Sequence, residues 1–243
     1  MLKKFWWLLP LLLLLAVAGF VAWSSDASQP MPEALAALQP NEDVAITQSP
    51  WLTFSPARQQ PEVGFIFYPG GKVDFRAYAP AARAIANQGY FVVIPAMPLN
   101  LAVFAPNKAK EIIQAFPQVK TWVIGGHSLG GSMACAFAFS NPGSVKGVVL
   151  WASYPAESNS LADKDLAVIS ISGSEDGLST PAKIEASRPF LPAGTQFVAI
   201  QGGNHAQFGW YGPQAGDNLA NISRPEQQKQ VVQETVNFLA QFR

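Results

Sequence analysis

The chain has 243 residues, of which 49% are apolar and 13% are charged, and this composition suits one globular domain with an appendage. Its 16 lysines and arginines balance 16 aspartates and glutamates, so no polyanionic partner such as nucleic acid is indicated. The single cysteine, Cys135, excludes an internal disulfide and a metal site built from several cysteines.

An uncharged apolar run occupies residues 5–23, directly after Lys3 and Lys4. As a helix, these 19 residues would extend roughly 28 Å, enough to cross the hydrocarbon core of a bilayer. The two lysines place its start in the cytoplasm, so residues 1–24 are predicted to anchor the rest of the chain outside the cytoplasm. The alternative is a cleaved secretory signal, because small residues suited to cleavage lie at the end of the run. In that case the protein is secreted.

Residues 25–41 are polar and contain proline, and they are predicted to form a tether to a folded domain at 42–243. In that domain, short runs of β-branched and aromatic residues alternate with stretches long enough for helices. This alternation predicts an α/β fold with a mostly parallel, eight-stranded sheet and helices on both faces. The expected strands are 44–48, 51–55, 63–68, 90–94, 121–124, 147–151, 166–172 and 196–200, and the first two form an antiparallel pair. The expected helices are 75–88, 105–116, 129–139 and 224–242.

The strand at 121–124 and the helix after it are joined by the G-x-S-x-G sequence of residues 126–130. A serine at a tight strand-to-helix bend takes a strained backbone conformation, and a Cβ two residues to either side would collide with the neighbouring elements. The two glycines therefore favour Ser128 as a nucleophile raised above the sheet edge. The free N–H of Leu129, in the first turn of the helix, is placed to hold a developing oxyanion. A glycine-rich turn with an N-capping serine is the alternative interpretation.

A serine hydroxyl needs a base to take its proton, and the usual base is a histidine oriented by a carboxylate. His127 adjoins Ser128 and would point away from its hydroxyl, so His205, in a glycine-rich loop after the last strand, is the candidate base. Asp176 follows the strand at 166–172 and is the candidate carboxylate, with Glu175 as the second choice. Loops after parallel strands meet at one edge of the sheet, where ligands bind.

The chain order Ser128, Asp176, His205 with this strand-turn-helix motif resembles the α/β-hydrolase family over residues 42–243. The segment Tyr68-Pro69-Gly70-Gly71 makes it most similar to small enzymes without a lid domain, related to dienelactone hydrolases and carboxylesterases. The resemblance implies that the Gly71 N–H is the second oxyanion donor, beside that of Leu129. Two departures exist. The loop begins Pro-Gly instead of the common His-Gly, and the nucleophile is a serine where true dienelactone hydrolases have a cysteine.

The short connection between Trp151 and the next strand leaves no room for a helical lid, so an open site is expected. Phe208 and Trp210, together with Trp151, either wall a substrate pocket or pack at the sheet edge. Lys72 either favours an anionic substrate or is simply solvated.

The sequence thus predicts a serine hydrolase that cleaves ester bonds of small substrates through an acyl-enzyme at Ser128, attached to the membrane by its N-terminal segment and facing outside the cytoplasm. A thioesterase or peptidase with the same three residues is an alternative, and a non-catalytic binding protein with this fold is another. The sequence has no metal-ligand grouping and no nucleotide-binding loop, so neither a metal nor a cofactor is expected.

Overall fold

Within residues 8–243, which the computed structural model describes, eight strands form one sheet in the order β1-β2-β4-β3-β5-β6-β7-β8. β2 runs antiparallel to β1 and β4, and the remaining neighbours pair in parallel. The strands are β1 (Val44–Thr47), β2 (Leu52–Pro56), β3 (Val63–Tyr68), β4 (Phe91–Ile94), β5 (Thr121–His127), β6 (Gly147–Trp151), β7 (Ala167–Gly173) and β8 (Gln196–Ile200). The predicted fold class is confirmed, including the antiparallel opening pair.

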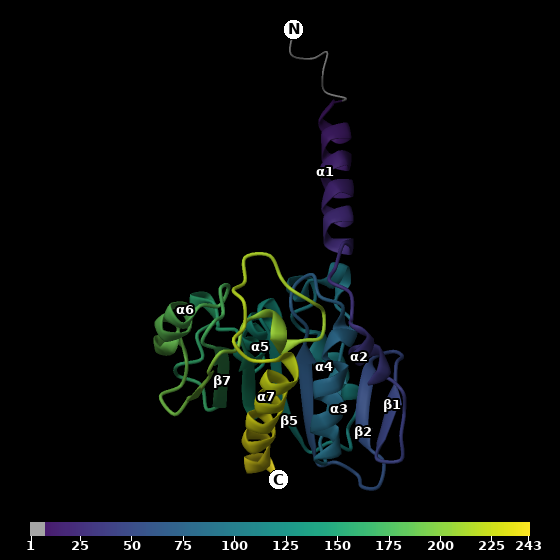
Figure 1. Ribbon diagram of the computed structural model, residues 1–243, viewed down its shortest axis with the longest axis vertical. Helices are drawn as coiled ribbons and strands as arrows, with labels where there is room; N and C mark the ends of the chain where they lie inside the picture. Colours follow the sequence, from purple (N-terminus) through teal and green to yellow (C-terminus); the bar gives the residue numbers. More distant parts are fainter. Residues whose placement is uncertain (1–7) are drawn as a thin grey trace.

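Helices cover both faces of the sheet (Figure 1). Those of the described chain are α1 (Leu8–Ser25), α2 (Pro32–Ala36), α3 (Ala79–Asn87), α4 (Lys108–Ala115), α5 (Leu129–Ser140), α6 (Pro181–Ala186) and α7 (Arg224–Leu239). α3 and α7 pack into one apolar layer, and α4 and α5 pack into the layer on the opposite face. Two expected helices begin later than predicted. A 3-10 turn at Phe75–Tyr78 precedes α3, and α4 starts only after Pro106, which cannot donate a backbone hydrogen bond.

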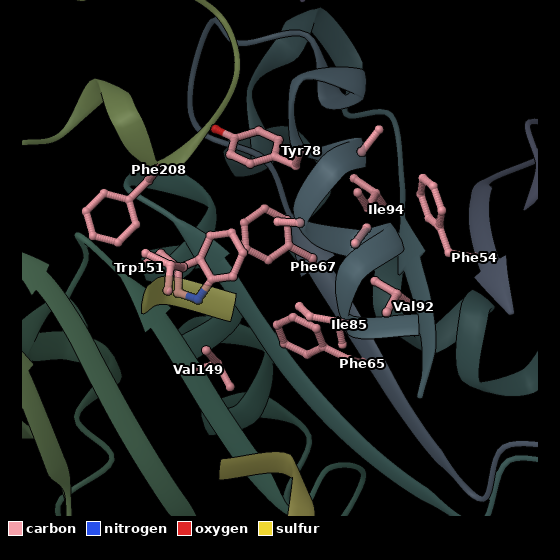
Figure 2. Close-up of a cluster of buried hydrophobic side chains, with 14 of the residues drawn as sticks. Phe54, Phe65, Phe67, Tyr78, Ile85, Val92, Ile94, Val149, Trp151 and Phe208 are labelled. Carbon is pink, nitrogen blue, oxygen red and sulfur yellow. The ribbon is translucent and has the colours of Figure 1, made fainter. Parts of the chain in front are cut away.

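The sheet separates the two apolar layers, and successive side chains along each strand point alternately into one layer and the other. On β3, Phe65 and Phe67 point into the layer with α3 and α7, whereas Ile66 and Tyr68 point into the layer with α4 and α5. Figure 2 shows the first layer, in which Phe67 packs against Trp151 with ring centroids 4.5 Å apart. A strand with both faces buried needs a continuous apolar sequence, which is what β3 has.

The N-terminal helix α1 projects away from the domain (Figure 1). Its 18 described residues are apolar and almost entirely exposed, and by length and composition it is a candidate membrane span or signal sequence. The first three residues of the expected span, 5–7, and the preceding Lys3 and Lys4 lie outside the described residues.

Residues 26–38, expected to be part of a free tether, pack against the domain instead. Ser28 forms a parallel β-bridge with Val73, and the Met31 N–H donates to the Trp210 carbonyl at 2.8 Å. In and just after α2, Ala34, Ala37 and Leu38 are buried. Their spacing places these three side chains on one helical face, which packs against the domain.

Candidate active site

Ser128 occupies the sharp bend between β5 and α5. Its backbone angles are φ 52° and ψ −123°, a conformation rarely adopted by residues other than glycine. The Ser128 N–H donates to the Trp151 carbonyl at 3.0 Å, and the Ser128 carbonyl accepts from the Ser153 hydroxyl at 2.6 Å. These bonds to and just after β6 hold the strained residue in place.

The glycines on either side of Ser128 are required by close backbone contacts. A Cβ on Gly126 would lie 2.5 Å from the Gly130 carbonyl carbon and 2.6 Å from the Tyr68 carbonyl oxygen. A Cβ on Gly130 would collide with the carbonyls of Tyr68 and Pro69. The predicted reason for the glycine spacing therefore agrees with the observed packing of β3 against the bend.

Asp176 and His205 form a buried pair. The Asp176 Oδ2 atom and the His205 Nδ1 atom are 2.8 Å apart, and both side chains are almost completely inaccessible. The other Asp176 oxygen, Oδ1, accepts from the N–H groups of Leu178 and Ser179 at 2.8 and 2.7 Å. The Asp176 carboxylate thus orients the His205 imidazole and also stabilises the turn at residues 176–179. Glu175, the second choice, accepts a hydrogen bond from Ser174.

The Ser128 bend and the His205 loop meet through His127. The imidazole rings of His127 and His205 have centroids 4.5 Å apart. Within residues 8–243, His205 Nε2 is buried and has no hydrogen-bond partner, and the Ser128 hydroxyl has none either. Catalytic hydrogen bonds are often long or misaligned without substrate, so this arrangement is compatible with a serine and its base.

Gly71 and Leu129, the two candidate oxyanion residues, are neighbours in the fold. A Cβ on Gly71 would lie 3.0 Å from Leu129 Cδ2. Leu129 begins α5, so its N–H has no partner within the helix. In the described chain, the neighbouring N–H groups of Gly70 and Lys72 are bonded to the Tyr78 hydroxyl and the Asn100 carbonyl, whereas that of Gly71 donates to no protein group.

The Tyr78 side chain links the loop after β3 to the bend after β5. Its hydroxyl accepts from the Gly70 N–H at 3.0 Å and lies 2.9 Å from His127 Nδ1. Burial, followed by the proximity of His205, lowers the pKa of His127 well below its usual range. Burial also raises the pKa of Tyr78. Both side chains are therefore neutral, and the hydrogen bond between them joins the loop after β3 to the bend after β5.

Asp217 is a residue that sequence reasoning missed. Its carboxylate accepts hydrogen bonds from the N–H groups of Gly177, His205 and Ala206 at 3.0, 3.2 and 2.8 Å. It therefore ties the turn that carries Asp176 to the loop that carries His205. The sequence signal was weak, consisting of one acidic residue after a glycine in a long loop.

The helix α7 also fixes the His205 loop. The buried Gln227 side chain accepts from the Asn204 N–H at 3.0 Å and donates to the Asn204 carbonyl at 2.8 Å. The Arg224 guanidinium donates to the carbonyls of Ala206 and Gly209. The histidine is thus positioned from both sides by elements that follow it in the sequence.

Trp151, Phe208 and Trp210 are expected either to wall a substrate pocket or to pack at the sheet edge, and the burial of Trp151 and Phe208 agrees with packing. Trp151 and Phe208 are 1% and 0% exposed and belong to the core layer shown in Figure 2. The Trp151 indole N–H donates to the Thr235 hydroxyl at 3.1 Å. Trp210 lies in a groove between α3 and α7. The Phe208 ring also stacks on the His127 ring, with centroids 5.7 Å apart, so it is enclosed by protein side chains.

Among residues 8–243, no cluster of three or more His, Cys, Asp or Glu side chains has a geometry that could hold a metal ion. Arg76, a cation near the site, is paired with Asp74 through bonds of 2.9 and 2.6 Å.

Comparisons with known proteins agree with this fold. The family model of the alpha/beta hydrolase family matches residues 64–229, so the chain belongs to that family. No curated protein matches significantly. The structure is similar to a hydrolase of Thermoplasma acidophilum predicted to be CIB-like (TM-score 0.60, 17% identity, covering 81% of this chain and 98% of that one). It is also similar to the esterase domain of a Rhodothermus marinus protein (TM-score 0.59, 15% identity, covering 77% and 90%). A protein of Klebsiella pneumoniae assigned as a dienelactone hydrolase is a third similar structure (TM-score 0.59, 16% identity, covering 82% and 97%).

Proposed function

We propose that this alpha/beta hydrolase is a serine esterase that cleaves carboxylic ester bonds of small substrates through an acyl-enzyme at Ser128. The observation that carries the proposal is the buried Asp176–His205 pair at the same sheet edge as the strained Ser128 bend. A non-catalytic binding protein has no need for this combination of a strained serine, a buried acid and a histidine with a free Nε2.

The arrangement supports a two-step mechanism. Asp176 accepts the Nδ1 proton of His205 in a hydrogen bond, which leaves Nε2 as the base for the Ser128 hydroxyl. The serine oxygen attacks the ester carbonyl, and the N–H groups of Leu129 and Gly71 stabilise the resulting oxyanion. His205 then protonates the departing alcohol. In the second step, His205 takes a proton from water as the water oxygen attacks the acyl carbonyl. The bond to the Ser128 oxygen then breaks, the carboxylic acid leaves, and His205 returns the proton to Ser128.

An oxygen ester is favoured over a thioester or an amide by the similarity to the esterase domain from Rhodothermus marinus. The same three residues are able to act on all three bond types, so thioesterase and peptidase activity remain as alternatives. The candidate span α1 further supports a domain held at the membrane and facing outside the cytoplasm.

The test is labelling by a fluorophosphonate, together with a panel of p-nitrophenyl esters, a matched thioester and a matched amide. We expect the wild-type chain to be labelled and to hydrolyse the ester fastest, and Ser128→Ala to abolish both labelling and hydrolysis. Ser132→Ala, in the same helix, is the matched control and should retain labelling. Labelling of the Ser128→Ala variant at the wild-type rate would remove Ser128 as the nucleophile. If the thioester or the amide is hydrolysed fastest, the protein is a thioesterase or a peptidase instead of an esterase.

A further inference from the structure

A cavity of about 610 Å³ opens beside Gly71, the candidate oxyanion residue. Trp23, Asp26 and Ala27, from the end of α1 and the segment after it, form one wall. Gly71, Lys72 and Leu101, from loops of the domain, also line it. Its volume is in the range of sites that bind small organic ligands.

This cavity adjoins the reaction site. The Cβ position of Gly71 is 3.0 Å from the side chain of Leu129 and 3.4 Å from that of Leu101. Leu129 directly follows Ser128 in the chain. The cavity therefore opens at Gly71, one of the two candidate oxyanion residues, and Gly71 in turn lies next to the side chain of Leu129, the other one.

The wall contributed by the N-terminal segment is held by specific contacts. The Lys72 ammonium lies 4.5 Å from the centroid of the Trp23 ring, a cation–π contact. The Asn100 side chain donates to the Ser24 carbonyl at 3.2 Å. The Ser28 N–H donates to the Lys72 carbonyl at 2.8 Å. The segment is thus built into the domain at this place.

The cavity also lies at the base of the apolar helix. Phe20, in the last turns of α1, contacts Phe104 edge to face with ring centroids 6.0 Å apart. Phe104 and its neighbour Val103 are themselves 52% and 49% exposed. Figure 1 shows α1 leaving the domain on the side that carries the loop before α7. If α1 crosses a bilayer, Trp23 is at the depth of the headgroups, where tryptophan is enriched, and the cavity opens at the membrane surface.

We propose that residues 23–28 form a wall of the substrate cavity, and that the substrate is an uncharged single-chain amphiphilic ester, such as a monoacylglycerol, taken from the membrane surface. This inference rests on the proposed esterase function and names its substrate class. Lys72 and Asp26 contribute one positive and one negative charge, so the lining favours a polar head without net charge. The uncleaved chain is then the active form, and the N-terminal segment supplies the wall that a lid domain would provide in other enzymes. Each methylene buried in the cavity should raise kcat/KM about fourfold.

The experiment uses the full chain in phosphatidylcholine vesicles and compares kcat/KM for monodecanoylglycerol with that for p-nitrophenyl acetate. The test variants are Trp23→Ala, which removes part of the wall, and Ala215→Trp, which narrows the cavity from the exposed loop on its far side. The control is Leu219→Trp, in the same loop at a residue that is 90% exposed. We expect the ratio of the two kcat/KM values to fall at least tenfold in both test variants and to stay within twofold in the control.

Two results would overturn the inference while leaving the esterase intact. One is Ser128-dependent hydrolysis of p-nitrophenyl acetate with an unchanged ratio in either folded test variant. The other is a mature N-terminus after Trp23 in an active protein, found by mass spectrometry. Failure of the wild type to hydrolyse either ester or to react with a fluorophosphonate would instead overturn the proposed function itself, and the inference with it.

Discussion

The Ser128 bend and the His205 loop carry the two halves of the same candidate site, but they are held in different ways. The bend depends mainly on its own glycines and on the adjacent strands β3 and β6. The His205 loop is held by Asp217, Gln227 and Arg224, which come later in the chain. The candidate nucleophile is thus positioned by a local motif, whereas the candidate base is positioned by long-range contacts that have no motif.

The largest expected effect tests whether the two halves act as one unit. We expect His205→Ala to lower kcat for p-nitrophenyl acetate by about four orders of magnitude, as does Ser128→Ala, because a serine without its base is a poor nucleophile. The double variant should be no slower than either single variant. Additive losses in the double variant would show that Ser128 and His205 work independently.

A smaller effect is expected at Asp217, which acts as a positioning residue. Asp217→Ala leaves four backbone N–H groups without their acceptor, and we expect kcat to fall roughly ten- to hundredfold with little change in KM, because the imidazole is displaced. Asp217→Asn keeps one acceptor oxygen and should restore part of the loss. The control is Asp163→Ala, at an exposed residue before β7. A wild-type kcat in a folded Asp217→Ala variant would show that the His205 loop does not need this clamp.

The smallest effect concerns the pH dependence of stability on the bend side. Folded His127 is neutral because burial lowers its pKa, whereas in the unfolded chain its pKa is about 6.5. As the pH falls below about 6.5, the unfolded chain binds a proton that the folded chain does not, so the free energy of unfolding decreases by up to about 1.4 kcal/mol per pH unit. Above that pH this contribution is constant.

His127→Asn is the matched variant, because its amide oxygen accepts from the Tyr78 hydroxyl without titrating. Urea unfolding between pH 5 and pH 8 should show a shallower pH dependence in this variant than in the wild type. Parallel curves for the two proteins would mean that His127 binds a proton equally in the folded and unfolded states.

The sequence by itself determined the family, the order of the strands along the chain and the residues of the candidate triad. These features depend on short patterns, namely apolar runs, a glycine spacing around Ser128, and polar residues directly after strands. The rule that loops after parallel strands meet at one edge then predicted that Asp176 and His205 would approach each other, as the structure shows.

Only the tertiary structure decided which residues surround that pair. Asp217 reaches His205 because the loop before α7 folds back over the sheet edge, and Trp151 and Phe208 are buried because α7 covers that face. Residues 23–28 lie beside Gly71 because a bridge from Ser28 to Val73 adds them to the domain. Each of these contacts joins segments that are far apart in the chain. Because such contacts form only when the whole domain packs, no local sequence pattern predicts them.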